Sequence, residues 1–140
     1  MGLRTWREGN GVRGEVTFDR RQEGAPGVAH GGALATVIDD ALGSLLMVIQ
    51  KPAVTARLEV DFRRPAPLGR TLIVEAWQDR AEGRKLHLAA RVSDQGQTIA
   101  EGSGLFLEVP IEHFSEQARQ VWKAHHGSWP RPVRQDTPRS

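Results

Sequence analysis

The segment His30-Gly31-Gly32 has the residue types of a site that polarises a carbonyl oxygen, because it stands directly before a long apolar run. If that run is a helix, its first turn presents backbone N–H groups without partners at the positive end of the helix dipole. Glycine lacks a Cβ, so a ligand can approach these amides closely. The alternative is that Gly31 and Gly32 only permit a tight turn into the helix.

Asp39 is the candidate base of such a site. It lies nine residues after His30 and inside the apolar run, where burial would raise the pKa of its carboxyl group and suit it to general-base catalysis. Nine residues of helix rise about 13.5 Å, so the two side chains cannot meet along one helix. A site that joins Gly31 with Asp39 therefore needs a second protomer. The alternative is a solvated or capped aspartate at a helix exit.

Two further groups could serve the same chemistry. Thr55, at the start of the next strand-like run, can orient a water beside a carboxylate, although threonine is also common in strands for its β-propensity alone. Gly83, Arg84 and Lys85 form a basic turn, and two adjacent cations suit phosphate groups. The alternative for that turn is a solvated loop.

No metal site is expected from the histidines outside the helix start. None of them has a metal-ligand spacing with partners of a suitable type, so we interpret them as surface residues. They are His87, His113, His125 and His126.

The apolar run from 30 to 49 is long enough for about five helical turns. Its apolar residues cover more than one stripe, which indicates a helix surrounded by protein. Asp39 and Asp40 would lie about 100° apart on this helix, so they cannot share one environment. Lys51-Pro52 ends the run, since the residue before a proline disfavours the α region.

Strand-like runs flank the helix, one before it and four after it. Short turns that contain glycine join the later runs, which favours antiparallel hairpins. The pattern predicts an α+β domain in which a five-stranded antiparallel sheet wraps around one helix. The expected strands span 11–19, 55–63, 71–79, 85–93 and 97–109.

A length of 140 residues is typical of one domain. We expect this domain to span 11–111, after a loose lead-in at 1–10 and before a C-terminal region at 112–140 that holds a short helix (112–124) and a flexible tail. An open sheet of five strands leaves an unpaired edge, and pairing with a second copy would cover it. A homodimer is therefore expected.

Composition excludes several classes of function. Cysteine is absent, which excludes disulfides, cysteine nucleophiles and thiolate metal sites. The net charge is only +2 and the basic residues are scattered, so nucleic-acid binding is not expected. We also expect no membrane span and, because the first ten residues lack the apolar core of a signal peptide, a cytoplasmic location.

Three segments together resemble the hotdog-fold acyl-CoA thioesterases of the PaaI-like type, which include mammalian relatives. These segments are HGGALATVIDDALG from residue 30, TARLEVDFRRPAPLG from residue 55 and EGRKLHLAARVSDQGQTIAEGSGLFLEV from residue 82. The resemblance covers roughly residues 11–109 in unbroken order. It implies a single hotdog domain, paired through its sheet edge into a dimer and in some relatives into a tetramer, with active sites between protomers.

The resemblance also implies residue roles. The Gly31 amide would bind the thioester oxygen, Asp39 would act as nucleophile or general base, and Thr55 would orient the hydrolytic water. His30 and Gly32 belong to the same motif. Some relatives carry an asparagine six residues before this histidine, where the present chain has Gly24.

The expected function is therefore hydrolysis of acyl-CoA thioesters to a carboxylic acid and CoA. CoA is part of the substrate, and no separate cofactor is expected. Two alternatives remain open: a non-catalytic acyl-CoA-binding or regulatory domain, and an enoyl-CoA hydratase or dehydratase. The acyl preference is open; the residues expected to line an acyl tunnel are Leu45, Leu46, Met47 and Trp122.

Overall fold

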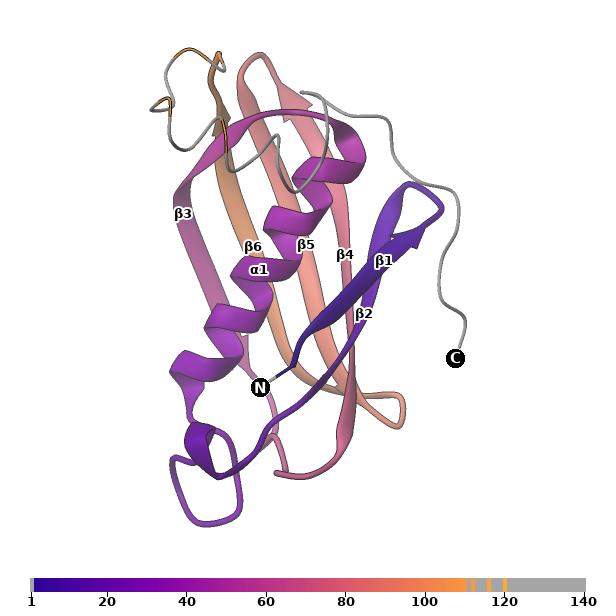
Figure 1. Cartoon of the computed structure of the whole chain (residues 1–140), viewed down its shortest axis with the longest axis vertical. Coiled ribbons are helices and arrows are strands. Elements are labelled where there is room, and N and C mark those ends of the chain that lie inside the picture. Colours follow the sequence, from indigo (N-terminus) through magenta and orange to yellow (C-terminus); the bar gives the residue numbers. More distant parts are fainter. Residues whose placement is uncertain (1, 111, 113–115, 117–119, 121–140) are drawn as a thin grey trace.

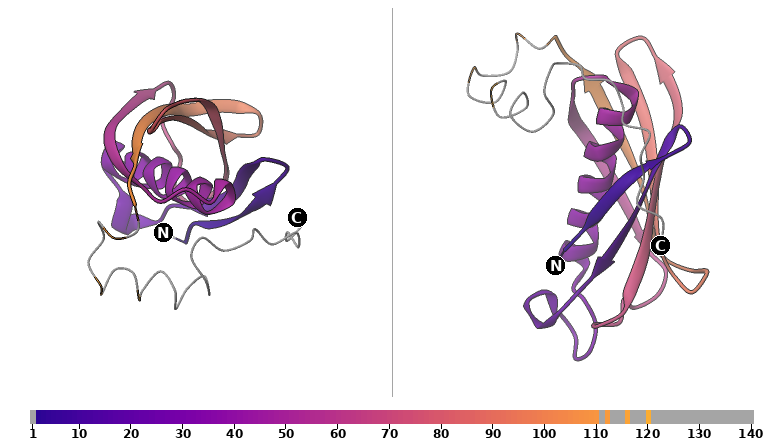
Figure 2. Two further views of the ribbon diagram at one scale, coloured as in Figure 1. Left: turned by 90° about the horizontal axis from the view of Figure 1, so that it is seen from above. Right: turned by 45° about the vertical axis from the view of Figure 1, so that its right-hand side comes forward.

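The computed structural model describes residues 2–110 together with 112, 116 and 120. Most of the predicted short helix at 112–124 and the tail that follows, including Trp122, therefore lie outside the described residues. Within residues 2–110 the chain forms one sheet wrapped around one long helix, with the helix lying across its concave side (Figures 1 and 2). This confirms the predicted α+β architecture.

The sheet has six antiparallel strands in the order β1-β2-β4-β5-β6-β3. Strands β4, β5 and β6 follow one another through tight turns as predicted, whereas β3 crosses over to the far edge beside β6 (Figure 1). The strands are β1 (Arg4–Glu8), β2 (Gly11–Thr17), β3 (Ala53–Phe62), β4 (Thr71–Glu82), β5 (Lys85–Asp94) and β6 (Gln97–Glu108).

The prediction of five strands was wrong by one. Residues 1–10, predicted as a loose lead-in, contain β1, which pairs with β2 from Arg4 opposite Glu15 to Glu8 opposite Gly11. Arg4 also forms a salt bridge with Glu15 at 2.8 Å and lies over the ring of Trp6. Arginine occurs on both faces of β1, so the sequence lacks the alternation of apolar and polar residues that would indicate a strand.

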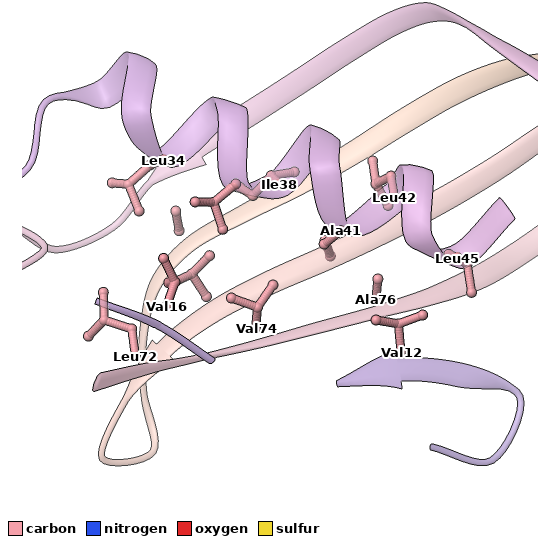
Figure 3. Close-up of a cluster of buried hydrophobic side chains, with 14 of the residues drawn as sticks. Val12, Val16, Leu34, Ile38, Ala41, Leu42, Leu45, Leu72, Val74 and Ala76 are labelled. Carbon is pink, nitrogen blue, oxygen red and sulfur yellow. The ribbon is translucent and has the colours of Figure 1, made fainter. Parts of the chain in front are cut away.

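Helix α1 (Gly31–Ile49) forms the centre of the core. Its inward residues pack against alternate residues of β2 and β4, and Figure 3 shows the two rows facing each other. Each fully buried aliphatic side chain of this kind stabilises the fold by about 1.5–3 kcal/mol. The buried positions on α1 are Ala33, Leu34, Val37, Ile38, Ala41, Leu42, Leu45 and Leu46.

By length and composition alone, the 19 residues of α1 are long and apolar enough to cross a membrane. In the structure, however, its apolar face is covered by the sheet, and its remaining face carries Asp39 and Asp40. The helix is thus the core helix of the domain, as its wide apolar pattern predicted.

Candidate functional site

The N-terminus of α1 is the first half of the candidate site. His30 caps the helix: its Nδ1 accepts a hydrogen bond from the Ala33 amide at 2.9 Å. The preceding amides, of Gly31 and Gly32, have no acceptor within the described part of the chain. Two free N–H groups at the positive end of a 19-residue helix are the kind of donors that can stabilise an oxyanion.

The loop before the helix holds this terminus in place. The His30 amide donates to the Gln22 carbonyl at 2.8 Å, and the Ala29 amide donates to Ala66 at 2.9 Å. Gly24 lies against His30, and a Cβ on it would come within 2.8 Å of the His30 Cβ. This backbone therefore has no room for a side chain at Gly24, where some relatives carry asparagine.

A short 3₁₀ turn, η1 (Arg20–Gln22), begins the same loop, and Asp19 caps it together with Gln22. Arg21 donates to both carboxylate oxygens of Asp19, and this lowers the pKa of Asp19 to about 2. The loop keeps this capped, charged form throughout the neutral pH range.

A groove of about 360 Å³ opens beside the free amides. Phe62, at the end of β3, forms one wall and is 54% exposed; a Cβ on Gly31 would lie 3.2 Å from its ring. The groove lining is Ala29, Gly31, Leu34, Phe62, Arg63, Arg64, Pro65 and Ala66.

Sequence reasoning did not single out Phe62, Arg63 or Arg64. The two arginines bring positive charge to the groove, but they differ in their partners. Arg63 pairs with Glu101 at 3.3 Å, whereas Arg64 has no acidic partner among the described residues. The adjacent cations before Pro65 were a visible signal, but only the fold brings them beside the helix N-terminus.

The second half of the candidate site contains Asp39 and Thr55. The Thr55 hydroxyl donates to Asp39 Oδ1 at 3.4 Å, and Asp39 is half-buried. A break in the pairing of β3 with β6 lies between Thr55 and Arg57. The structure thus brings together the carboxylate and the hydroxyl that the sequence singled out.

Asp40 differs from Asp39 in its surroundings. Its pKa is raised, first by burial of part of its carboxyl group and second by the negative charge of Asp39. Asp40 is nevertheless an exposed residue, and the Thr55 hydroxyl bonds to Asp39 rather than to Asp40. The two adjacent aspartates therefore occupy different environments, as predicted.

The two halves do not meet within one protomer. Gly31 and Asp39 are separated by about 12 Å of helix, and neither Asp39 nor Thr55 lines the groove. The turn that contains Gly83 and Arg84 lies beyond the opposite end of α1 from Gly31 (Figure 1). Within a single chain, the structure does not bring the predicted phosphate-binding turn to the helix N-terminus.

The described residues contain no group of three or more histidine or acidic side chains that could hold a metal ion. The arrangement instead offers free backbone amides, a carboxylate with a hydroxyl beside it, and nearby arginines.

Residues 26–101 match the family model described as the thioesterase superfamily. The chain belongs to the thioesterase superfamily. This match, together with a single long helix wrapped by an antiparallel sheet, confirms the resemblance noted in the sequence.

Among curated relatives of this thioesterase superfamily member, the acyl-coenzyme A thioesterase THEM4 of Bos taurus is 40% identical over 95 residues. The match covers 66% of this chain but 39% of the relative, so the chain spans about two fifths of that protein's length.

Solved structures confirm the hotdog fold. A Streptococcus mutans protein bound to acetyl CoA, smu.793, has a TM-score of 0.72 and 19% identity, over 78% of this chain and 90% of that one. The E. coli PaaI protein from the phenylacetic acid degradation operon has a TM-score of 0.71 and 19% identity, over 77% of this chain and 80% of that one.

Proposed function

We propose that this superfamily member hydrolyses acyl-CoA thioesters to a carboxylic acid and CoA. The observation that carries the proposal is that one chain holds both free amides at the start of α1 and, further along the helix, a carboxylate, Asp39, with a hydroxyl donor beside it. The similarity to a protein named acyl-coenzyme A thioesterase and the fold shared with an acetyl-CoA-bound protein support it.

The active site is proposed to form between two protomers. Strand β3 is the edge of the sheet beside β6, and it exposes two large apolar side chains, Val54 at 42% and Phe62 at 54%. Antiparallel pairing of β3 with a second β3 would cover this edge. Because the helices would then run in opposite directions, Asp39 of one chain would face the Gly31 amide of the other.

In this arrangement Asp39 accepts a proton from a water that Thr55 helps to orient, and the water oxygen attacks the thioester carbonyl carbon. The partner's Gly31 amide donates a hydrogen bond to the oxyanion of the tetrahedral intermediate. The C–S bond then breaks, and CoA leaves as the thiolate, which takes up a proton.

The second route open to Asp39 is direct attack, which forms a mixed anhydride that water hydrolyses. Single turnover in H₂¹⁸O tests for the anhydride, because its hydrolysis at the aspartyl carbonyl places ¹⁸O in Asp39 itself, whereas direct attack of water on the thioester leaves Asp39 unlabelled. Mass spectrometry of the peptide that contains Asp39 gives the answer.

The phosphates of CoA are proposed to bind the arginine side of the groove. Arg64 is exposed without an acidic partner in the described residues, so it is available for a phosphate. In the proposed dimer, the turn with Arg84 and Lys85 of one chain approaches the groove of the other, because the two helices run in opposite directions. The turn that the sequence predicted to bind phosphate would then lie near the groove of the partner.

The deciding experiment is the Asp39→Asn variant. Loss of the base or nucleophile should reduce CoA release by a factor of about 10² or more. Free CoA is followed with a thiol reagent, and the chain adds no background because it has no cysteine. Asp40→Asn is the matched control and should retain turnover.

Normal turnover in Asp39→Asn would refute the proposal that Asp39 is the base or nucleophile. Tight binding of acyl-CoA by the unaltered chain without CoA release would instead indicate a binding domain. Hydration of an enoyl-CoA would indicate an enoyl-CoA hydratase or dehydratase.

A further inference from the structure

Phe62 is a large apolar side chain in direct contact with the proposed oxyanion site. Its ring lies so close to Gly31 that a Cβ there would come within 3.2 Å of the ring Cζ atom and 3.4 Å of Cε1. The same ring forms part of the lining of the groove beside the free amides. A ligand oxygen that accepts a hydrogen bond from the Gly31 amide is therefore held beside the ring.

The pleat of β3 directs Phe62 to this place. Side chains alternate along a strand, and Phe62 follows Leu58 and Val60, which pack against the core on the inner face of the sheet. Phe62 does not belong to that cluster, and at 54% exposure its ring is open to a ligand. The next amide, of Arg63, donates to the Ile99 carbonyl at 2.8 Å. The backbone under the ring is thus held by the sheet on both sides.

The groove lining contains both charged and apolar side chains. Arg63 and Arg64 supply the charge, which suits the phosphates of CoA in the proposed function. Leu34 and Phe62 supply apolar surface next to Gly31. A thioester carbonyl carbon carries the sulfur of CoA on one side and the α-carbon of the acyl group on the other. The acyl side matches the apolar wall.

We propose that Phe62 is a specificity-determining residue, which selects against acyl groups that are branched at the α-carbon. This rests on the proposed hydrolysis. A carbonyl oxygen held about 2.9 Å from the Gly31 nitrogen has the α-carbon two bonds away, beside the ring. An exposed ring can give way slightly, but a methyl branch projects by about 1.5 Å. Acyl groups with an unbranched α-carbon therefore fit the groove, and α-branched groups are crowded.

The residues that the sequence suggested for an acyl tunnel do not line this groove. Leu45 and Leu46 are buried in the core, with 0% and 7% exposure, so that expectation was wrong for both. Met47 lies about 24 Å along the helix from Gly31. Trp122 lies outside the described residues. Within one chain, discrimination next to the thioester carbonyl therefore depends on the groove lining.

The test uses two isomeric substrates, α-methylbutyryl-CoA and β-methylbutyryl-CoA, which differ only in the position of the methyl branch. Their kcat/KM values are measured by CoA release, and their alkaline hydrolysis gives the intrinsic ratio of reactivity. We expect the unaltered chain to prefer the β-methyl isomer about tenfold or more beyond that ratio. Phe62→Ala should lower the preference to the intrinsic ratio, and Phe62→Leu, which keeps part of the bulk, should lie between the two.

The ratio of two isomers separates specificity from folding. Any loss of stability or of contacts between chains in Phe62→Ala lowers the turnover of both isomers alike and leaves their ratio unchanged. The matched control is Trp77→Ala, which removes a ring of 41% exposure from a separate hollow, and it should keep the preference of the unaltered chain. An unchanged preference in Phe62→Ala, or an unaltered chain that shows only the intrinsic ratio, would overturn the proposal.

Failure of the proposed function gives a separate result. If the unaltered chain releases CoA from neither isomer nor from unbranched butyryl-CoA, hydrolysis of these thioesters is refuted. The comparison is then made on the Kd of the two isomers, measured by isothermal titration calorimetry. A preference for the β-methyl isomer that disappears in Phe62→Ala would support the role of Phe62 without hydrolysis, whereas equal Kd values or no binding would overturn it.

Discussion

Two adjacent aspartates with different surroundings give the domain a pH dependence that a single variant can reveal. Asp40 has a raised pKa, caused first by partial burial of its carboxyl group and then by the charge on Asp39. An acid with a raised pKa binds more protons in the folded state than in the unfolded state. Its contribution to stability therefore falls as pH rises from its ordinary pKa, about 3.9, through its raised value.

We predict that Asp40→Asn unfolds at a higher temperature than the unaltered chain at about pH 7, and that this gain disappears at about pH 3. The variant removes the ionised carboxylate that disfavours folding, whereas at low pH both proteins carry a neutral group there. Thermal unfolding followed by circular dichroism across this range measures the difference. A gain that is independent of pH would show that the charge of Asp40 is not its cause.

At the residue scale, types and spacing singled out His30, Gly31, Asp39 and Thr55 as candidates, and of these the structure brings Asp39 and Thr55 into contact. The cationic wall of the groove was not found. Arg64 comes beside Gly31 only because the segment after β3 folds back against the helix start, through the hydrogen bond between Ala29 and Ala66. No local pattern encodes that long-range contact.

At the element scale, helix α1 depends on its cap. We predict that His30→Ala lowers the free energy of unfolding by about 1 kcal/mol, whereas His30→Asn retains most of it, because asparagine also accepts a hydrogen bond at an N-cap. The same order should hold for kcat, since a frayed first turn misplaces the Gly31 amide. Urea unfolding and CoA release on the same samples measure both quantities.

Equal stability of the two His30 variants would show that the hydrogen bond to Ala33 does not hold the helix start. Equal stability with unequal kcat would assign His30 a direct contact with substrate instead.

Hydrophobic periodicity predicted the elements that bury one face. Leu86, Leu88, Ala90 and Val92 alternate inward along β5, and α1 shows the wide apolar pattern of a surrounded helix. It failed for β1, whose five residues carry three charges and gain their strand conformation from pairing with β2. A short edge strand of this kind depends on tertiary pairing more than on its own sequence.

At the scale of the whole molecule, the proposed active site makes a prediction about two chains that can be tested with two inactive variants. Gly31→Pro removes the N–H that is proposed to bind the oxyanion. Proline is favoured at the first position of a helix, and the extended backbone of His30 (φ −75°, ψ 157°) suits a residue before proline. The new Cβ would lie 3.2 Å from the ring of Phe62, which is exposed enough to shift.

Asp39→Asn retains the amide but lacks the carboxylate, and Gly31→Pro retains the carboxylate but lacks the amide. In a dimer of one chain of each kind, one site combines the intact Asp39 with the intact Gly31 amide, and the other site has neither. Random pairing makes half of the dimers mixed, so co-expression should restore about a quarter of the unaltered activity. CoA release from the co-expressed pair, compared with each variant alone, measures this. If both groups acted within one chain, co-expression would restore nothing, and the site between protomers would be refuted even though each variant is inactive.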